Sequence, residues 1–375
     1  MISLNERSVV VGVDVHKYSH TAVAMDSWGK EKDRLEFSND NLPIYTTWLN
    51  SFGPKEDLFV GLEDVNCYGT HLVEELRREG FHIRYVPAIL TERERKSSTK
   101  RQKSDYVDAK RVGKVILTKF EETLPAKESI ADEAELKTAQ ALDLLLMERR
   151  DLVKEKTALK NQLHALLHQY YGDHYADDFK KPFNQDAIDF YLENLENPKE
   201  KHILATSIVR RLKRLVLLEE HIGSISEELA VIGKKSDEVM ALTNTIHGCG
   251  MVTACSIMAE LTTIKRFAGK DNLASYAGVA PTEHSSGRKN KLHTNPFGNR
   301  RLNRALHTIA LSQIACKGDP RGKEYYQKKL KEGKTKLWAL RCLKHQIAKR
   351  VFRVLREVLK NPVRSKENEA QNCSR

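Results

Sequence analysis

Long apolar runs are missing from this 375-residue sequence: none approaches the roughly 18 residues that a membrane-spanning helix needs. The first residues, Met1 to Arg7, also lack the apolar region of a signal peptide. With 40% hydrophobic residues and a mean hydropathy of −0.54, the composition predicts a soluble protein.

Cysteine pairs are missing as well. The six cysteines are scattered and form no CxxC pair (Cys67, Cys249, Cys255, Cys316, Cys342 and Cys373). This spacing argues against a zinc site and a disulfide framework, and it predicts reduced thiols in a cytoplasmic protein.

Acidic residues are outnumbered by basic ones. Lys and Arg total 63 against 51 Asp and Glu, which gives a net charge of +12 and a pI near 9.2. A basic surplus favours polyanionic partners, although it does not separate DNA from RNA or from an anionic membrane.

The first third of the sequence alternates strand and helix patterns. Three short strands come first, followed by helices and strands in alternation (strands 9–15, 20–25 and 35–38, helix 41–52, strand 58–63, helix 70–79, strand 81–86, helix 105–120). Ser104 is a natural N-cap for the last helix. This order predicts an α/β, ribonuclease-H-like fold, and the polar, basic segment 91–103 is predicted to be a loop.

The middle of the sequence predicts two long amphipathic helices, from about Asp132 to Tyr170 and from about Glu200 to Ile232. In the first, leucine recurs every seven residues (Leu145, Leu152, Leu159 and Leu166). Two arrangements fit: an antiparallel helical hairpin within one chain, or a coiled-coil arm that forms a dimer. An apolar seam does not identify its partner, so both stay open.

The last third is predicted to be mainly helical, with helices at 251–261, 301–315 and 336–359 and a polar loop at 282–300. The turn Gly248-Cys249-Gly250 resembles that of a helix-hairpin-helix motif, whose backbone N–H groups can bind phosphate. The tail from Asn361 is predicted to be disordered. We therefore predict four regions: a ribonuclease-H-like catalytic domain at 1–125, a helical coiled-coil region at 126–238, a mainly helical C-terminal domain at 239–335, and a basic helix with its tail at 336–375.

Four carboxylates stand out in this frame: Asp14 in a strand otherwise made of valine and glycine, Glu63 at the end of another strand, and Asp105 and Asp108 at the start of a helix. Asp105 at a helix start and Glu63 at a strand end each have a structural explanation, whereas packing alone does not explain Asp14 in the interior of a strand. Together, in this order of strands and helices, they predict a site for one or two Mg²⁺ or Mn²⁺ ions of the kind that assists phosphoryl transfer.

The segments Gly12 to Lys17, Leu62 to Gly69 and Asp105 to Ala109 resemble the DEDD domain of the insertion-sequence one-ten family of transposases, a domain similar to the Holliday-junction resolvases. The resemblance implies that Asp14, Glu63, Asp105 and Asp108 are the metal-binding, catalytic tetrad. His16 and Lys17 match the same strand end, and we assign them no catalytic role.

Residues 243–314 resemble the second, C-terminal transposase domain of that family (246–250, 267–281, Ser286-Gly287 and 298–302). The resemblance implies that Ser286 is the nucleophile that attacks DNA. Ser285 is adjacent and chemically equal, so only the resemblance favours Ser286.

Basic residues near both parts of this site are candidates for nucleic-acid contact, although a run of charge is more often a solvated surface. The candidates are Arg93, Arg95, Lys96, Lys100, Arg101, Lys103, Arg288, Lys289, Lys291, Arg300 and Arg301. A further basic run with Tyr325, Tyr326 and Trp338 interleaved would suit base stacking, or its aromatic residues belong to the core.

The resemblance implies a transposase that recombines DNA through a covalent phosphoserine intermediate. It also implies an element-encoded bridge RNA that selects donor and target DNA, and homodimers that pair into tetramers. Two alternatives are a junction-selective endonuclease that uses the carboxylates and water, and a non-catalytic nucleic-acid-binding protein. An actin-like ATPase is disfavoured because no later Asp-Gly-Gly-type phosphate loop follows.

Overall fold

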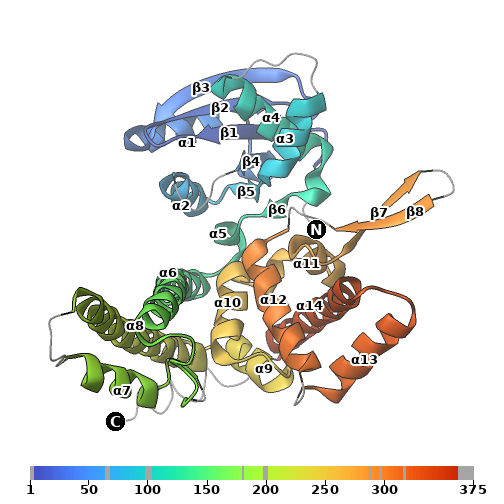
Figure 1. Ribbon diagram of the computed structural model, residues 1–375. Coiled ribbons are helices and arrows are strands. Elements are labelled where there is room, and N and C mark those ends of the chain that lie inside the picture. The colour runs from blue at the N-terminus through green and yellow to red at the C-terminus, as the bar shows by residue number, and fades with distance from the viewer. Residues whose placement is uncertain are drawn as a thin grey trace, which may run out of the picture. The chain divides into compact units, whose positions relative to one another are not determined.

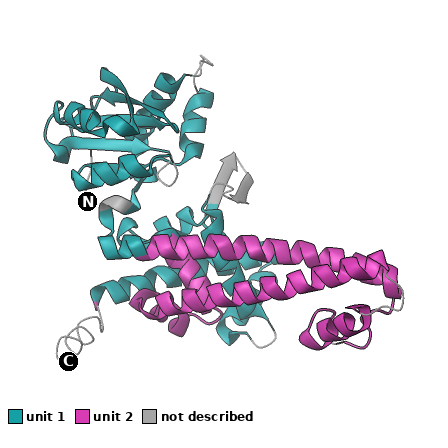
Figure 2. Ribbon diagram, turned by 90° about the vertical axis from the view of Figure 1, so that its left-hand side faces the viewer, with its two compact units in different colours: residues 1–137, 260–360 teal, residues 138–259, 361–375 magenta. Residues whose placement is uncertain are grey.

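The computed structural model describes residues 4–63, 68–97, 104–179, 181–196, 202–286, 289–294, 298–315 and 318–361, without the side chains of 128–129 and 282–294. Contacts divide the chain into two compact units (Figure 2). Unit 1 comprises residues 1–137 and 260–360, and unit 2 comprises 138–259 and 361–375. The predicted disordered tail lies outside the described residues from 362 on.

A mixed six-stranded sheet forms the N-terminal part of unit 1 (Figure 1). Its strands are β1 (Val9–Val15), β2 (Ser19–Met25), β3 (Glu31–Ser38), β4 (Leu58–Leu62), β5 (His82–Tyr85) and β6 (Leu124–Pro125), in the order β3-β2-β1-β4-β5-β6. β1, β2 and β3 are antiparallel neighbours, whereas β4 pairs in parallel with both β1 and β5. This arrangement is consistent with the predicted ribonuclease-H-like fold.

Helices cover both faces of the sheet because β1 and β4 are apolar on both faces. On one face, Val9, Val11 and Val13 belong to a core shared with α1 (Leu42–Asn50) and α2 (Thr70–Arg78). On the other face, Val10 packs with residues of α3 (Ala88–Ser97) and α4 (Asp105–Thr118).

Two predictions for this region were wrong. β3 begins at Glu31, four residues before the predicted strand. The prediction missed these first residues because they are polar and mostly exposed. Segment 91–97 is helical, as part of α3, although it was predicted to be a loop. Leu90 is buried there, and Glu92 forms ion pairs with Arg95 and Lys96 one helical turn away, which stabilises a helix despite the high charge.

The two predicted long helices are confirmed: α6 (Glu133–Tyr171) and α8 (Ile203–Lys234) lie side by side in unit 2 (Figure 2). Arg149 donates to Ser226 at 3.0 Å, and Arg214 donates to Glu155 at 2.8 Å, so the helices run antiparallel within one chain. Helix α7 (Gln185–Glu196) shares one apolar core with α6 and α8. Helices α9 (Asp237–Thr245) and α10 (Met251–Leu261) follow in the sequence. The in-chain hairpin is therefore present.

The C-terminal part of unit 1 contains α11 (Lys270–Tyr276), α12 (Arg300–Ile314), α13 (Pro320–Lys331) and α14 (Lys336–Lys360). A hairpin of β7 (Pro281–Ser286) and β8 (Lys289–Thr294) replaces the predicted loop at 282–300. Its polar sequence has no apolar alternation, which is why the strands were missed. The remaining elements are α5 (Lys127–Ile130) and short 3-10 helices at Asn39–Asn41, Lys55–Asp57, Phe120–Glu122 and Ile264–Arg266. Among the helices of the described residues, none is long and apolar enough to cross a membrane.

Candidate active site

Two paired strands each carry a glycine two residues before an acid. In β1 these residues are Gly12 and Asp14; in β4 the glycine is Gly61, and Glu63 follows the strand end. Gly12 and Gly61 are partners in the parallel register. Because side chains alternate between the faces of a strand, the glycines and the acids share one face. That face is the one covered by α4.

The glycines allow α4 to lie very close to the sheet. A Cβ atom added at Gly12 would be 2.0 Å from the carbonyl oxygen of Ala109, and one added at Gly61 would be 2.1 Å from Cδ1 of Ile116. A side chain at position 12 would therefore hold the helix backbone away from the sheet, whereas one at position 61 would displace the side chain of Ile116.

The first turn of α4 is fixed by its N-cap. The Oγ atom of Ser104 accepts a hydrogen bond from the backbone N–H of Val107, as predicted. Close packing and capping together place Asp105 and Asp108 beside the ends of β1 and β4.

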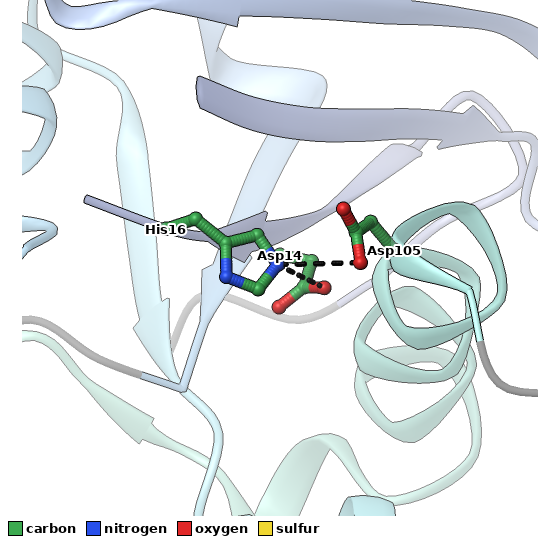
Figure 3. Close-up of side chains that lie close together, drawn as sticks. All are labelled: Asp14, His16 and Asp105. Atoms are coloured by element: carbon green, nitrogen blue, oxygen red, sulfur yellow. Dashed lines mark hydrogen bonds and ion pairs between the residues drawn. The ribbon is translucent and has the colours of Figure 1, made fainter. Parts of the chain in front are cut away.

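Asp14, His16 and Asp105 form the most compact part of the site (Figure 3). His16 Nε2 lies 3.2 Å from Oδ2 of Asp14 and 3.4 Å from Oδ1 of Asp105. One ligand atom from each of the three residues lies within 4.8 Å of the others. Desolvation raises the pKa of the Asp14 carboxyl, His16 opposes the rise, and the charges of Asp108 and Asp105 add to it.

Glu63 and Asp108 complete the carboxylate group. Glu63 is exposed as a whole residue, yet its carboxyl is packed closely enough that desolvation raises its pKa. A hydrogen bond with buried Thr91 opposes that rise, and the charges of Asp14 and Asp108 add to it. Asp108 is paired with the buried guanidinium of Arg111 one turn along α4.

The arrangement fits a divalent cation. Carboxylate oxygens are the ligands that Mg²⁺ and Mn²⁺ prefer. Desolvation and mutual repulsion make ionised Asp14 and Glu63 unfavourable by themselves, and a bound cation would offset both effects. We therefore identify Asp14, Glu63, Asp105 and Asp108 as candidate ligands, and the ring nitrogen of His16 lies beside two of them, Asp14 and Asp105.

Two basic side chains of this site were not predicted. His16 was named without a role, and Arg111 was not named. Their sequence signals are nonetheless local: His16 is two residues after Asp14 on the same strand, and Arg111 is three residues after Asp108 on a helix.

The predicted nucleophile, Ser286, is the last residue of β7 and pairs with Lys289 across the hairpin. The side chains of Ser285, Ser286, Lys289 and Lys291 lie outside the described residues, as does Arg288 altogether. The roles of these residues stay predictions.

The base of this hairpin is closely packed. A Cβ atom added at Gly298 would be 2.2 Å from the backbone of Gly278, so the entering and leaving chains touch there. The side chain of Asn299 caps α12 and donates to Glu260 at 2.7 Å and to Tyr276 at 3.0 Å. The hairpin therefore projects from a fixed base.

The predicted nucleic-acid contacts are spread over several elements. Arg93, Arg95 and Lys96 lie on α3, and the last two are paired with Glu92. Arg300 and Arg301 begin α12, where Arg301 lies 3.3 Å from Glu260. The others on the loop before α4 (Lys100, Arg101 and Lys103) lie outside the described residues.

A cavity of about 520 Å³ in unit 1 is lined from two sides. Tyr85, Leu90 and Arg93 line it from β5 and α3. Tyr276 and Asn299 line it from the base of the β7–β8 hairpin. The segment after β5 and the hairpin base thus share one cavity.

Comparison with known proteins gives two family matches. Residues 11–172 match the transposase family of the DEDD, IS110 type, and residues 240–327 match the transposase IS116/IS110/IS902 family. The first match covers the carboxylates and the second covers Ser286.

Individual relatives agree with these matches. The transposase for insertion sequence element IS1111A of Coxiella burnetii is 32% identical over 154 residues, which is 41% of each chain. The insertion element IS110 uncharacterized 43.6 kDa protein of Streptomyces coelicolor is 24% identical over 95% of this chain and 96% of its own length. The transposase for insertion sequence element IS1328 of Yersinia enterocolitica is 24% identical over 76% of this chain and 77% of its own. The chain belongs to the IS116/IS110/IS902 family of transposases, enzymes that act on DNA.

Proposed function

We propose that this chain catalyses transposition of an insertion sequence by cleaving and rejoining DNA strands, with Ser286 as the nucleophile and Mg²⁺ held by Asp14, Glu63, Asp105 and Asp108. The observation that carries the proposal is that Asp14 and Asp105 meet where α4 approaches the end of β1. The charge of Asp108 raises the pKa of both Asp14 and Glu63, which supports adding Asp108 and Glu63 to the proposed set. When bound there, the cation would stabilise negative charge on the phosphate oxygens of the DNA.

The proposed step is a substitution at phosphorus. The Oγ atom of Ser286 forms a bond to the phosphorus while the bond from phosphorus to one deoxyribose oxygen breaks. The serine proton passes to solvent, and the leaving oxygen gains a proton from solvent. Rejoining reverses the step with a deoxyribose hydroxyl of another strand, which restores the serine.

The shared cavity supports a substrate path between the two parts of unit 1. Arg93, one of the predicted DNA contacts, lines it beside polar groups of the hairpin base, and Glu121 and Glu122 line it as well. The basic surplus of the whole chain is consistent with a polynucleotide partner.

Guidance by a bridge RNA and assembly of dimers into tetramers are further parts of the proposal. The dimer is supported by apolar side chains left exposed on the long helices of unit 2, of which Leu144 is 61% and Leu217 54% exposed. A second chain would pack on these exposed leucines and not on the predicted heptad seam, because Leu152, Leu159 and Leu166 pack in the core of the in-chain hairpin.

The test of the nucleophile compares Ser286→Ala with the matched control Ser285→Ala. With end-labelled DNA and Mg²⁺, the wild type and Ser285→Ala are expected to give a protein–DNA adduct that survives denaturing electrophoresis, and Ser286→Ala none. Asp14→Asn should abolish the adduct as well, because the cation site loses a ligand. Loss of the adduct in Ser285→Ala alone would move the nucleophile to that residue.

The same variants test the endonuclease alternative. A water-dependent nuclease would keep cutting DNA in Ser286→Ala and would never give the adduct. For the guide RNA, we expect one defined species encoded beside the gene to copurify with the protein from cells that carry its native flanking DNA. Recovery of random fragments alone would refute the guided part of the proposal.

A further inference from the structure

A second cavity lies at the root of β7, away from the carboxylates. Its volume is about 250 Å³, and it lies between the segment Gly278–Pro281 and helices α13 and α14. This volume is slightly below the roughly 300–1,000 Å³ that drug-sized ligands fill, which suits a ligand of about one nucleotide.

Two aromatic side chains line this cavity, Tyr325 from α13 and Trp338 from α14. Both are half-buried, so neither is a core residue. Lys329 lies 5.4 Å from the ring centre of Tyr325, and Arg341 lies 5.3 Å from that of Trp338. The rings are therefore held in place by cations while part of their surface faces the cavity.

The lining is basic. Lys329, Lys334 and Arg341 contribute to it, and no acidic side chain of the described residues does. Glu332 pairs with Lys329 at 2.7 Å without lining the cavity, so it offsets part of that one charge. A ligand that satisfies this lining has a flat aromatic group and a negative charge.

We infer that this cavity binds one unpaired nucleotide of a polynucleotide, with its base against Trp338 and Tyr325 and its phosphate near Lys334. The β7 strand leads from the cavity to Ser286, five residues beyond Pro281, or about 17 Å in an extended strand. A nucleotide held there would fix a strand at the base of the serine hairpin. The inference goes beyond the proposed chemistry, since it requires neither the nucleophile nor the cation.

The test measures binding without cleavage. Full-length protein in EDTA is titrated into fluorescein-labelled single strands, dT15 in one arm and rU15 in the other, and anisotropy is recorded. Trp338→Leu is expected to weaken binding about 5- to 150-fold, because base stacking on an aromatic residue contributes about 1–3 kcal/mol. Trp28→Leu is the matched control, since Trp28 is 85% exposed in the turn after β2. Whichever strand binds more tightly identifies DNA or RNA as the source of the nucleotide.

Three further measurements separate a binding defect from a folding defect. Trp338→Phe should recover most of the affinity, Tyr325→Leu should repeat the loss, and Lys334→Gln should weaken binding relative to Lys235→Gln on an exposed part of unit 2. A 5-iodouracil strand should crosslink to Trp338 or Tyr325 in the wild type. Equal affinity of Trp338→Leu and Trp28→Leu, or crosslinks confined to other residues, would overturn the inference. Binding is measured in EDTA, without cleavage, so failure of the proposed nucleophile leaves this result unchanged.

Discussion

Replacing Gly12 with alanine would place a methyl group against the backbone of α4. The new Cβ atom would lie 2.0 Å from the carbonyl oxygen of Ala109 and 2.4 Å from the nitrogen of Gly113, whereas real Cβ contacts are essentially never shorter than 3.0 Å. Backbone atoms cannot rotate away, so the helix must move by about 1 Å. Overpacking of this kind costs about 1–3 kcal/mol, and we expect the upper end of that range.

A loss of function should accompany the loss of stability. Asp105 and Asp108 move with α4, whereas Asp14 stays on β1, so a shift of about 1 Å separates the ligands. A misplacement of that size typically lowers a rate about a hundredfold. Gly12→Ala should therefore melt at a lower temperature and cleave labelled DNA about a hundredfold more slowly.

The matched control is Gly223→Ala, in the interior of α8. A Cβ atom added there meets nothing within 4 Å, and helix propensity favours alanine by about 1 kcal/mol. That variant should keep full activity and melt slightly higher. Wild-type cleavage by Gly12→Ala with an unchanged melting temperature would refute the close-packing explanation of the site.

Three other substitutions should change the stability of the fold, each in a direction that follows from the structure. In EDTA at pH 7.5, Asp14→Asn should raise the melting temperature. Desolvation raises the pKa of Asp14 in the folded state, so the wild type loses stability as the pH rises through that pKa. The difference in melting temperature should vanish near pH 3.8, the ordinary pKa of the group, and equal melting temperatures at pH 7.5 would contradict the prediction. Asn299→Ala should lower the free energy of unfolding by about 1–2 kcal/mol through loss of the α12 cap and the bond to Glu260, measured by urea denaturation beside an exposed Asn→Ala control. Burial lowers the pKa of Lys344 from 10.5 to about 8. The destabilisation caused by its charge is therefore fully present below pH 8, and it decreases as the pH rises to 10.5. Lys344→Met should remove a destabilisation of about 3 kcal/mol and lose about 1 kcal/mol with the hydrogen bond to Asn303. In thermal melts recorded from pH 8 to pH 10.5, its higher stability relative to the wild type should disappear near pH 10.5.

Most of the α/β region could be predicted from the sequence because its strands are short apolar runs between clear turns. The predicted bounds of β1 agree with the structure, and those of β2 and β4 differ by one residue. The N-cap at Ser104 could also be predicted, because a cap depends only on residues next to it in the sequence. Where a strand is polar, as in the first half of β3, no apolar pattern marks it.

Elements with high charge or no apolar periodicity could not be predicted. Helix α3 carries five charged side chains in ten residues, and α13 has a similar composition. Their helical state depends on ion pairs along the helix and on packing with other segments, such as the burial of Leu90 against the sheet. These contacts arise only after the chain has folded.

The candidate site was predictable as a set of residues and not as a geometry. The sequence shows four acids, but the approach of α4 depends on glycines that face each other across two strands. Gly12 and Gly61 are 49 positions apart, and only the strand register brings them together. The three-residue spacing of Asp108 and Arg111 can be read from the sequence, whereas the burial of Arg111 follows from where α4 packs.

The same close packing links folding to metal binding. It desolvates Asp14 and Glu63 and brings the charge of Asp108 near both, so the folded protein holds carboxylates that would ionise more easily in the unfolded chain. His16 lowers the pKa of Asp14 but does not restore it to its ordinary value, so the protein's own cations leave part of the cost in place. A divalent ion that binds only the folded state offsets that cost and adds its binding free energy to stability. Mg²⁺ should therefore raise the melting temperature of the wild type and have little effect on Asp14→Asn. Equal shifts in both proteins would show that the ion binds elsewhere.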